Sequence, residues 1–255
     1  MPSCMIYFLA VLFCWDKVLS MELSVLLLAR NEEASLRELL PRLRELLQRL
    51  SIAGEIVLVD GGSEDLTVEV ARKCGAKVLR QRKPGYGEAL REGISACTGR
   101  HLLTLDADGS HSVEDAGLLI ERRREADLII GSRYVQGGRN LSSPFRLYLS
   151  KLLNLIFRVG LSLPFRDLSS GFRLYRLETL RGISTCAKSF DVLEEIVFKL
   201  FLKGATIIEV PITFRPRLYG SSKAAFGKLL PSYFTTFLLL LRLSRLSSCS
   251  GTRYR

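Results

Sequence analysis

The sequence predicts an α/β protein in which helices flank a mostly parallel β-sheet. Short apolar runs alternate with helical stretches through the first half of the chain, and this alternation is typical of βαβ units. Two of these runs end in an aspartate, which is expected where strands deliver polar groups to one edge of a sheet. The 255 residues are 47% hydrophobic and 25% charged, a composition that suits one large folded core.

The expected elements alternate in order from residue 22 to residue 132. Strands are expected at 22–28, 55–60, 76–80, 101–106 and 127–132. Helices are expected at 32–50, 64–73, 86–97 and 113–124. Within the second helix signal, Ser63 followed by Glu64 and Asp65 fits an N-cap with acids in the first turn.

The second half continues with helices and one further strand. Residues 146–160 keep apolar side chains at helical spacing with basic margins, and a polar loop at 167–170 precedes the run GFRLYR. A helix is expected at 192–202, a strand at 205–214 and a basic amphipathic helix at 224–246. Because no internal repeat or long linker separates the halves, we expect residues 21–223 to form one domain, followed by a basic segment at 224–255.

The formal charge of +11 is concentrated in two segments that contain no acid. Residues 134–166 hold five Lys or Arg and residues 215–255 hold eight, which leaves 24 basic against 26 acidic residues elsewhere. Such local excess suits nucleic acid, an anionic membrane surface or a phosphorylated ligand, whereas a scattered excess is usually solvated surface charge.

Two apolar segments raise the question of a membrane. Residues 1–20 form a hydrophobic extension whose apolar part, 5–15, is too short to span a bilayer and lacks a basic start and a cleavage site. We expect either a start assigned upstream of Met21 or a peripheral anchor. The uncharged stretch 229–241 is also too short to span. The six cysteines form no C-x-x-C pair and indicate reduced thiols inside the cell.

Acidic residues mark the ends of two predicted strands. Asp60 ends one, and Asp106 and Asp108 follow another as the motif DAD. Side chains two apart on a strand point to the same side, so this pair could hold Mg²⁺ or Mn²⁺ together with the phosphates of a ligand. Alternatively, Asp106 and Asp108 could be a structural pair held by hydrogen bonds, with no metal. The chain contains no P-loop, and its KPGYGEALREG stretch is not a complete dinucleotide-binding fingerprint.

Seven motifs in fixed order carry a resemblance to a known family. They are Asn31-Glu32, DGGS, KPGYGEALREG, DADGSH, GSRY, DLSSGFRLYR and EVPITFRPRLYGSSK. From about residue 22 to residue 223 the chain resembles family 2 glycosyltransferases with the GT-A fold, and among them the dolichol-phosphate mannosyltransferases. The resemblance implies a Rossmann-like sheet and an inverting, metal-dependent hexosyltransferase.

The resemblance also implies roles for matching positions. Asp106, Asp108 and Arg133 would be catalytic, with Mg²⁺ or Mn²⁺ held by Asp106 and Asp108. Arg133 and Lys151 would hold the acceptor phosphate. The implied nucleotide-sugar contacts are Asn31, Glu32, Asp60, Lys83, Gly87, Asp106, Ala107, Asp108, Arg217 and Lys223.

The implied reaction transfers a sugar from a nucleotide-sugar to dolichyl or polyprenyl phosphate. GDP-mannose is the preferred donor, but the chain has Leu28-Ala29-Arg30 where relatives often carry Pro-x-Tyr, and Ser110 where a third metal ligand often sits, so UDP-sugars such as UDP-glucose stay open. The enzyme would work at the cytoplasmic membrane face, held peripherally by 146–160 and 224–246 or by a membrane-protein partner.

Two alternatives use other acceptors or no enzyme at all. A hydroxyl acceptor, on a lipid-linked sugar or a polysaccharide, would need a general base, for which Asp167 and Glu194 are the candidates. A basic nucleic-acid-binding protein is the other alternative. The sequence has no helix-turn-helix, RRM or zinc signature, so we expect no nucleic-acid partner.

Overall fold

The computed structural model describes residues 21–217, 219 and 226–249, with the backbone alone for 226–229 and 247–249. The hydrophobic extension at 1–20 and the predicted donor contact Lys223 lie outside the described residues.

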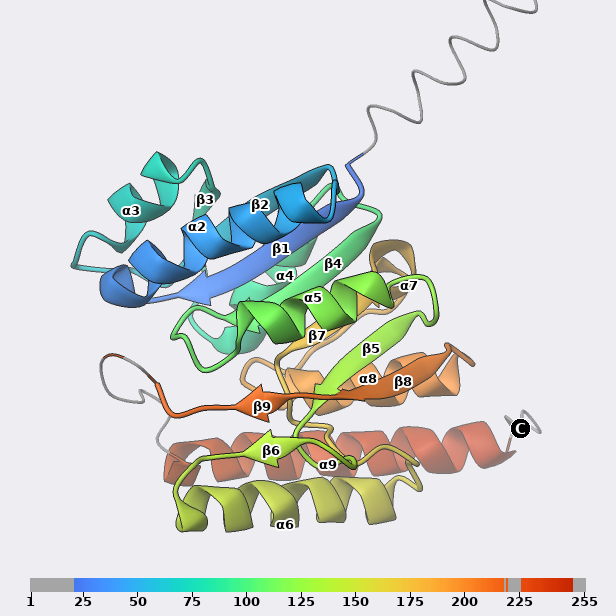
Figure 1. The fold of residues 1–255 in the computed structure, drawn as a ribbon. Coiled ribbons are helices and arrows are strands. Elements are labelled where there is room, and N and C mark those ends of the chain that lie inside the picture. The colour runs from blue at the N-terminus through green and yellow to red at the C-terminus, as the bar shows by residue number, and fades with distance from the viewer. Residues whose placement is uncertain (1–20, 218, 220–225, 250–255) are drawn as a thin grey trace, which may run out of the picture.

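The fold is built on a seven-stranded sheet in the order β3-β2-β1-β4-β7-β5-β8 (Figure 1). The strands are β1 (Leu23–Ala29), β2 (Gly54–Asp60), β3 (Lys77–Arg80), β4 (His101–Asp106), β5 (Leu128–Ser132), β7 (Arg173–Arg176) and β8 (Ile207–Pro211). All neighbouring pairs are parallel except those of β7, which runs antiparallel between β4 and β5. The α/β class with a mostly parallel sheet is thus confirmed.

Helices cover both faces of the sheet. They are α2 (Glu33–Arg49), α3 (Thr67–Lys73), α4 (Tyr86–Ala96), α5 (Val113–Glu121), α6 (Pro144–Gly160), α7 (Leu177–Arg181), α8 (Val192–Leu202) and α9 (Phe226–Cys249). Alternate side chains of β1 enter different cores: Val25 and Leu27 pack with α2, α3 and α5, whereas Leu26 packs with α4, α7 and α8. Because both faces are buried there, the strands β1, β2, β4 and β5 are largely apolar runs without a polar face.

Two predicted elements differ in detail. Helix α3 begins at Thr67, so the prediction of an N-cap at Ser63 is wrong. Ser63 instead donates both its backbone N–H and its hydroxyl to the Asp60 carboxylate. The hydroxyl therefore does not cap a helix. The strand predicted at 205–214 divides into β8 and β9 (Thr213–Phe214), and β9 pairs with β6 (Arg139–Asn140) in a second small sheet.

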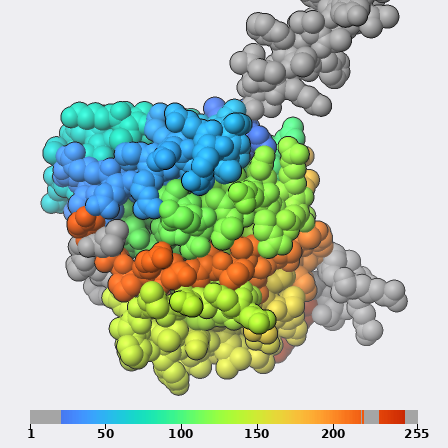
Figure 2. Space-filling model, viewed as in Figure 1, coloured from blue at the N-terminus to red at the C-terminus, as the bar shows by residue number. Residues whose placement is uncertain are grey.

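Helices α6 and α9 lie side by side beyond the β8 edge (Figure 1). The ring of Phe157 on α6 meets the rings of Tyr233 and Phe237 on α9 at centroid distances of 6.2 and 5.1 Å. In the space-filling view, β8 and β9 cross the surface between α5 and α6 (Figure 2). Within the described part of the chain, none of the helices has the length and apolar character needed to cross a membrane.

Candidate active site

The carboxyl ends of three neighbouring parallel strands bring the predicted acids to one edge of the sheet. Ala29 at the end of β1 is in register with Asp60 on β2, and Leu28 is in register with Asp106 on β4. Ligands of open α/β sheets bind at this edge. The strand order therefore places the two acidic strand ends on either side of β1, where the β1–α2 turn carries Asn31 and Glu32.

Asn31 and Glu32 connect this turn to the turn after β2. Asn31 adopts a φ of 53°, a left-handed conformation that asparagine tolerates better than most residues. Its side-chain oxygen accepts from the N–H of Glu64 at 2.8 Å, and its own N–H donates to Ser63 Oγ at 2.9 Å. The N–H of Glu32 donates to Thr67 Oγ1 at 2.9 Å. Both residues therefore hold two turns of the site together.

Asp60 is buried and engaged within its own turn. Its carboxylate accepts from the N–H of Gly62 at 3.2 Å, the N–H of Ser63 at 3.1 Å and the Ser63 hydroxyl. In this arrangement Asp60 shapes the β2–α3 turn. A contact with a nucleoside would use the acceptor capacity that these three donors leave on the carboxylate.

Asp108 is neutralised by a side chain from far along the sequence. Arg217 Nε lies 2.8 Å from Asp108 Oδ2, and Arg217 Nη1 lies 3.1 Å from Glu32 Oε1. The other oxygen of Asp108 accepts from the N–H of Ser110 at 2.9 Å. The Asp108 side chain is 7% exposed, because Arg217 lies against it. The positive charge that makes the DAD pair tolerable is, in this structure, a guanidinium.

Asp106 has a different partner and is open to solvent. Its side chain is 39% exposed, and Oδ2 lies 3.2 Å from Nε2 of the buried His111. Desolvation by the surrounding protein would raise the pKa of Asp106, but the hydrogen bond to His111 and the charges of Arg217 and Arg133 hold this pKa below its usual value. Asp106 is thus kept as an anion on the open side of the pair.

The sequence analysis missed His111. Its ring lies between Phe172 and Phe214, with centroids at 4.6 and 5.4 Å, and its Nδ1 is buried without a hydrogen-bond partner. An N–H left unpaired in an apolar setting is costly, so the proton belongs on Nε2, where it can be donated to Asp106. The spacing DADGSH was the available signal, since it places one of only two histidines beside the acids.

The acid pair would make a half-site for a divalent cation. Among the described residues no group of three or more His, Cys, Asp or Glu side chains is arranged to hold a metal. Two carboxylates, one of them solvent-exposed, fit Mg²⁺ or Mn²⁺ that also takes phosphate and water oxygens. They do not form a closed protein cage. Asp106 and Asp108 would hold the ion, and Arg217 would have to leave or share Asp108.

Arg133 is fixed by a buried carboxylate. Its Nε and Nη2 donate to Asp167 at 2.7 and 2.6 Å, its N–H donates to the same carboxylate at 2.9 Å, and Nη2 also donates to Ser169 Oγ at 2.8 Å. Burial would lower the pKa of Arg133, but Asp167 raises it. The guanidinium therefore stays charged and rigid.

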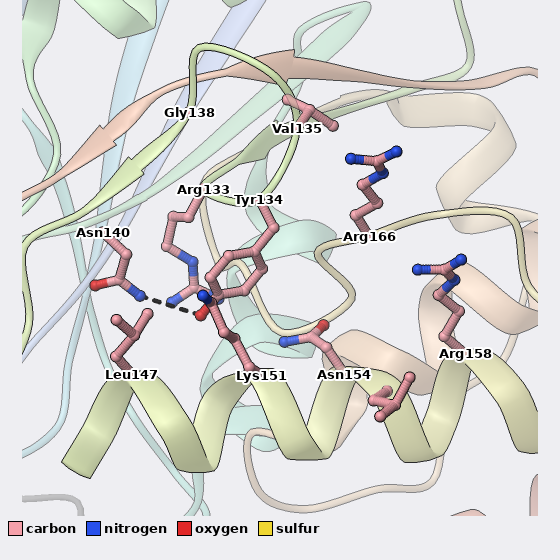
Figure 3. A pocket seen from close by; sticks show the side chains of 11 residues that line it. Arg133, Tyr134, Val135, Gly138, Asn140, Leu147, Lys151, Asn154, Arg158 and Arg166 are labelled. Atoms are coloured by element: carbon pink, nitrogen blue, oxygen red, sulfur yellow. Dashed lines mark hydrogen bonds between the residues drawn. The ribbon is translucent and has the colours of Figure 1, made fainter. Parts of the chain in front are cut away.

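Arg133 lines a basic pocket of about 580 Å³ against α6 (Figure 3). Its lining includes Arg133, Tyr134, Asn140, Lys151, Asn154, Arg158 and Arg166 and contains no acid. The structure thus brings together Arg133 and Lys151, which were predicted as a pair. Arg158 and Arg166 were predicted only as part of an acid-free segment with no assigned site, and no role was predicted for Tyr134.

The chain matches one family model and several named proteins. The family model described as glycosyl transferase family 2 matches residues 24–183. The dolichol-phosphate mannosyltransferase of Pyrococcus furiosus is 34% identical over 87% of this chain and 64% of its own length. The undecaprenyl-phosphate mannosyltransferase of Micrococcus luteus is 36% identical over 77% of this chain and 85% of its own length.

This chain belongs to glycosyltransferase family 2. The match covers the sheet from β1 through β7 and both acidic strand ends. The chain spans less than two thirds of the Pyrococcus enzyme.

Solved structures of the glucosyl-3-phosphoglycerate synthase of Mycobacterium tuberculosis support the GT-A-like fold. One, in complex with Mn²⁺, UDP and glucosyl-3-phosphoglycerate, has a TM-score of 0.68 at 20% identity, covering 87% of this chain and 80% of that one. A second contains Mg²⁺ and UDP at the same score and identity, covering 87% of this chain and 79% of that one.

Three predicted donor contacts of this glycosyltransferase lie in different settings. Lys83 is exposed in the turn before α4, where it is free to reach a ligand. Gly87 is buried, and a Cβ there would lie 2.3 Å from the carbonyl oxygen of Ala187, so close packing accounts for this glycine. Ala107 points into the apolar core, which leaves only its backbone for a donor.

The two acids considered as a general base are both closed to substrate. Asp167 is 0% exposed and pairs with Arg133. Glu194 is buried, and neither of its carboxylate oxygens has a hydrogen-bond partner. Burial, together with the negative charges of Asp191 and Asp167, raises the pKa of Glu194 to about 8. Neither carboxylate is presented to a hydroxyl acceptor in this structure.

Proposed function

We propose that this glycosyltransferase moves a sugar from a nucleotide-sugar to a polyprenyl phosphate. Mannose from GDP-mannose is the first choice, and a UDP-sugar such as UDP-glucose is the alternative donor. Relatives named for dolichol phosphate and for undecaprenyl phosphate share a polyprenyl monophosphate as the acceptor chemistry. The observation that carries the proposal is the acid-free basic pocket between Arg133 and Lys151, which adjoins the exposed apolar side of α6.

The donor would bind at the acidic edge of the sheet. A divalent cation held by Asp106 and Asp108 would supply charge stabilisation for the departing nucleoside diphosphate. Asn31, Glu32, Asp60 and Lys83 surround this edge and would contact the donor. Arg217 can exchange its carboxylate partners for the diphosphate, since both are charge-assisted contacts of the same kind.

The acceptor needs to be positioned more than it needs to be deprotonated. A phosphate monoester has a second pKa of about 6 and is already an anion at neutral pH. Arg133, fixed by Asp167, and the exposed Lys151 would orient it through charge-assisted hydrogen bonds. Direct attack of the phosphate oxygen on the anomeric carbon would invert the configuration of the sugar. The closed state of Asp167 and Glu194 supports this acceptor over a hydroxyl.

The prenyl chain of the acceptor would lie near a membrane-facing surface formed by α6 and α9. Apolar side chains on both helices are exposed, with Phe145 at 70%, Val159 at 68% and Phe234 at 64%. Exposed apolar residues flanked by Lys and Arg are typical of helices in a membrane interface. We therefore propose peripheral attachment to the cytoplasmic face of a membrane, alone or with a membrane-protein partner, through α6 and the 224–255 segment.

Transfer of a radiolabelled sugar tests this function directly. Purified protein with Mn²⁺ is incubated with labelled GDP-mannose or UDP-glucose and one of three acceptors: polyprenyl phosphate, polyprenol or a lipid-linked sugar. The proposal predicts organic-extractable label with polyprenyl phosphate alone, and a β-linked product from an α-linked donor. Label on polyprenol or on the lipid-linked sugar, with none on the phosphate, would overturn it.

A further inference from the structure

The basic pocket contains more positive charge than one acceptor phosphate needs. We infer that Arg158 and Arg166 form a second phosphate site that binds the head-group phosphate of a membrane lipid while Lys151 and Arg133 hold the acceptor. The inference rests on the proposed function for the role of the inner pair. Its own evidence lies in how the four basic side chains are distributed along the pocket.

The pocket has two ends separated by two turns of helix. Lys151 and Arg158 are seven residues apart on α6, which corresponds to about 10 Å along the axis. In the close view, Arg133, Tyr134 and Lys151 gather at one end, and Arg158 and Arg166 at the other (Figure 3). One monophosphate cannot contact both ends at hydrogen-bond distance, so the outer pair is available to a different anion.

The outer pair is not neutralised by the protein. Among the described residues, neither Arg158 nor Arg166 has a carboxylate within ion-pair distance, and the pocket lining contains no acid. The acid next to this end is Glu209, whose two oxygens accept from the backbone N–H groups of Arg166 and Asp167 at 2.8 and 3.0 Å. Glu209 therefore holds the loop in place, and the guanidinium groups are left for a ligand.

The surroundings of the outer pair favour a lipid over a free phosphate. Leu155 lies one turn before Arg158 on the same side of α6 and is 53% exposed, and Ile156 and Val159 are 44% and 68% exposed around the same part of the helix. A cation beside exposed apolar side chains matches a bilayer interface, where the head-group phosphate lies above the acyl chains. A free phosphate gains nothing from these apolar side chains. We therefore assign the outer pair to a phosphodiester head group at the membrane surface.

Vesicle binding of the full-length Arg158→Gln/Arg166→Gln variant tests the assignment. The probes are vesicles of phosphatidylcholine alone and of phosphatidylcholine mixed with phosphatidylglycerol. Each lost charge near an anionic surface should weaken binding on the order of 5-fold, so the double variant should bind mixed vesicles roughly 30-fold more weakly. Binding to neutral vesicles should change little. Turnover of a water-soluble short-chain polyprenyl phosphate should stay at the wild-type level.

Two further variants serve as controls. Arg72→Gln/Lys73→Gln removes the same charge from exposed positions on α3 and should leave vesicle binding unchanged. Arg158→Lys/Arg166→Lys keeps the charge and should retain most of the binding, which separates loss of charge from loss of folding.

Four results would overturn the inference. These are an equal loss in the α3 control, an equal loss on neutral vesicles, a fall in turnover of the soluble acceptor, and displacement of mixed vesicles by millimolar glycerol phosphate. The last would mean that the site takes free phosphate. Because vesicle binding needs no sugar transfer, failure of the proposed reaction would show in the transfer assay alone.

Discussion

At the scale of single residues, the adjacent acids Asp106 and Asp108 are stabilised by unlike partners. His111 orients Asp106 through Nε2, and Arg217 covers Asp108 while also holding Glu32. Two carboxylates at one strand end repel each other unless cations lie near. In this structure the cation beside Asp108 is the Arg217 guanidinium. A divalent metal bound together with the donor would share this neutralising role.

Sequence reasoning located the acids but not all of their partners. The DAD motif at the end of an apolar run was sufficient to place both carboxylates at the sheet edge. The Arg217–Asp108 pair could not be derived, because it depends on how the chain after β9 returns to the site. Likewise, the hydrogen bonds from Ser63 to Asp60 were not predicted, because the same residues also fit an N-cap pattern.

Replacing Lys151 with glutamine should weaken acceptor binding selectively. A charge-assisted hydrogen bond contributes about 1.5–3 kcal/mol, so the KM for polyprenyl phosphate should rise on the order of 10-fold or more while the KM for the nucleotide-sugar stays unchanged. Initial-rate kinetics with each substrate varied in turn measure this. Lys73→Gln on exposed α3 is the matched control. Equal changes in both KM values would refute the assignment of Lys151.

Glu194 should make stability depend on pH in an unusual direction. Its pKa of about 8 in the fold exceeds the ordinary value of 4.5, because burial and the charges of Asp191 and Asp167 disfavour ionisation, although Arg173 acts against them. Between these values the folded state keeps a proton that the unfolded chain has lost. The contribution of Glu194 to the free energy of unfolding therefore falls as pH rises from about 5 to 8.

The Glu194→Gln variant, which mimics the protonated acid, should remove this dependence. Its unfolding free energy should decline less with pH than that of the wild type, by at most about 1.4 kcal/mol per pH unit. Urea unfolding at pH 5.5 and pH 8 provides the comparison. Parallel pH profiles for the two proteins would show that Glu194 does not titrate in this range.

At the scale of elements, the apolar runs and helical stretches predicted the alternating strands and helices of the first half, but not β6, β7 or α7. The strands β1, β2, β4 and β5 coincide with short apolar runs, because both faces of the sheet are covered there. The antiparallel direction of β7 was not predictable, since the run GFRLYR has the same pattern in either direction. The start of α3 at Thr67, rather than at residue 64, was also not predicted. Residues 61–66 form the turn that Asp60 organises.

Helix α9 is attached to the catalytic core by polar contacts as well as apolar ones. Asp191, buried at the start of α8, accepts through Oδ2 from Ser232 Oγ at 2.8 Å and from Thr236 Oγ1 at 2.6 Å. Buried carboxylates are costly when they lose donors. The two hydroxyls therefore fix how α9 sits against α8 and, through Phe237, against α6.

Thr236→Val should loosen this attachment without changing side-chain shape. The loss of one donor to the buried Asp191 carboxylate should lower the free energy of unfolding by about 1.5–3 kcal/mol. Thr235→Val is the matched control, because Thr235 is exposed and donates only to the Pro231 carbonyl. That change should cost less than about 0.5 kcal/mol. Denaturant unfolding of both variants decides the point, and equal losses would contradict a role for Asp191 in docking α9.

At the scale of the whole molecule, acidic and basic chemistry are kept on neighbouring parts of the fold. Carboxylates gather at the ends of β1, β2 and β4, whereas the basic pocket lies against α6 beyond β8. Arg133 directly follows β5, and its positive charge helps to lower the pKa of Asp106. In the proposed reaction, the donor would bind on the acidic side and the anionic acceptor on the basic side.

The acid-free segments in the sequence anticipated this division of charge. They could not show that α6 and α9 pack together, because that contact depends on Phe157, Tyr233 and Phe237 meeting across the fold. The order of motifs was sufficient for the family. The arrangement of α6 and α9 required the structure.

Binding of Mn²⁺ in the presence of a nucleoside diphosphate tests the central claim most directly. Electron paramagnetic resonance titrations with GDP, and with UDP as the alternative, report bound Mn²⁺ without requiring turnover. The account predicts that the nucleotide tightens Mn²⁺ binding to the wild type and that Asp106→Asn and Asp108→Asn each weaken it by at least about 10-fold. Unchanged Mn²⁺ binding in both variants would contradict it.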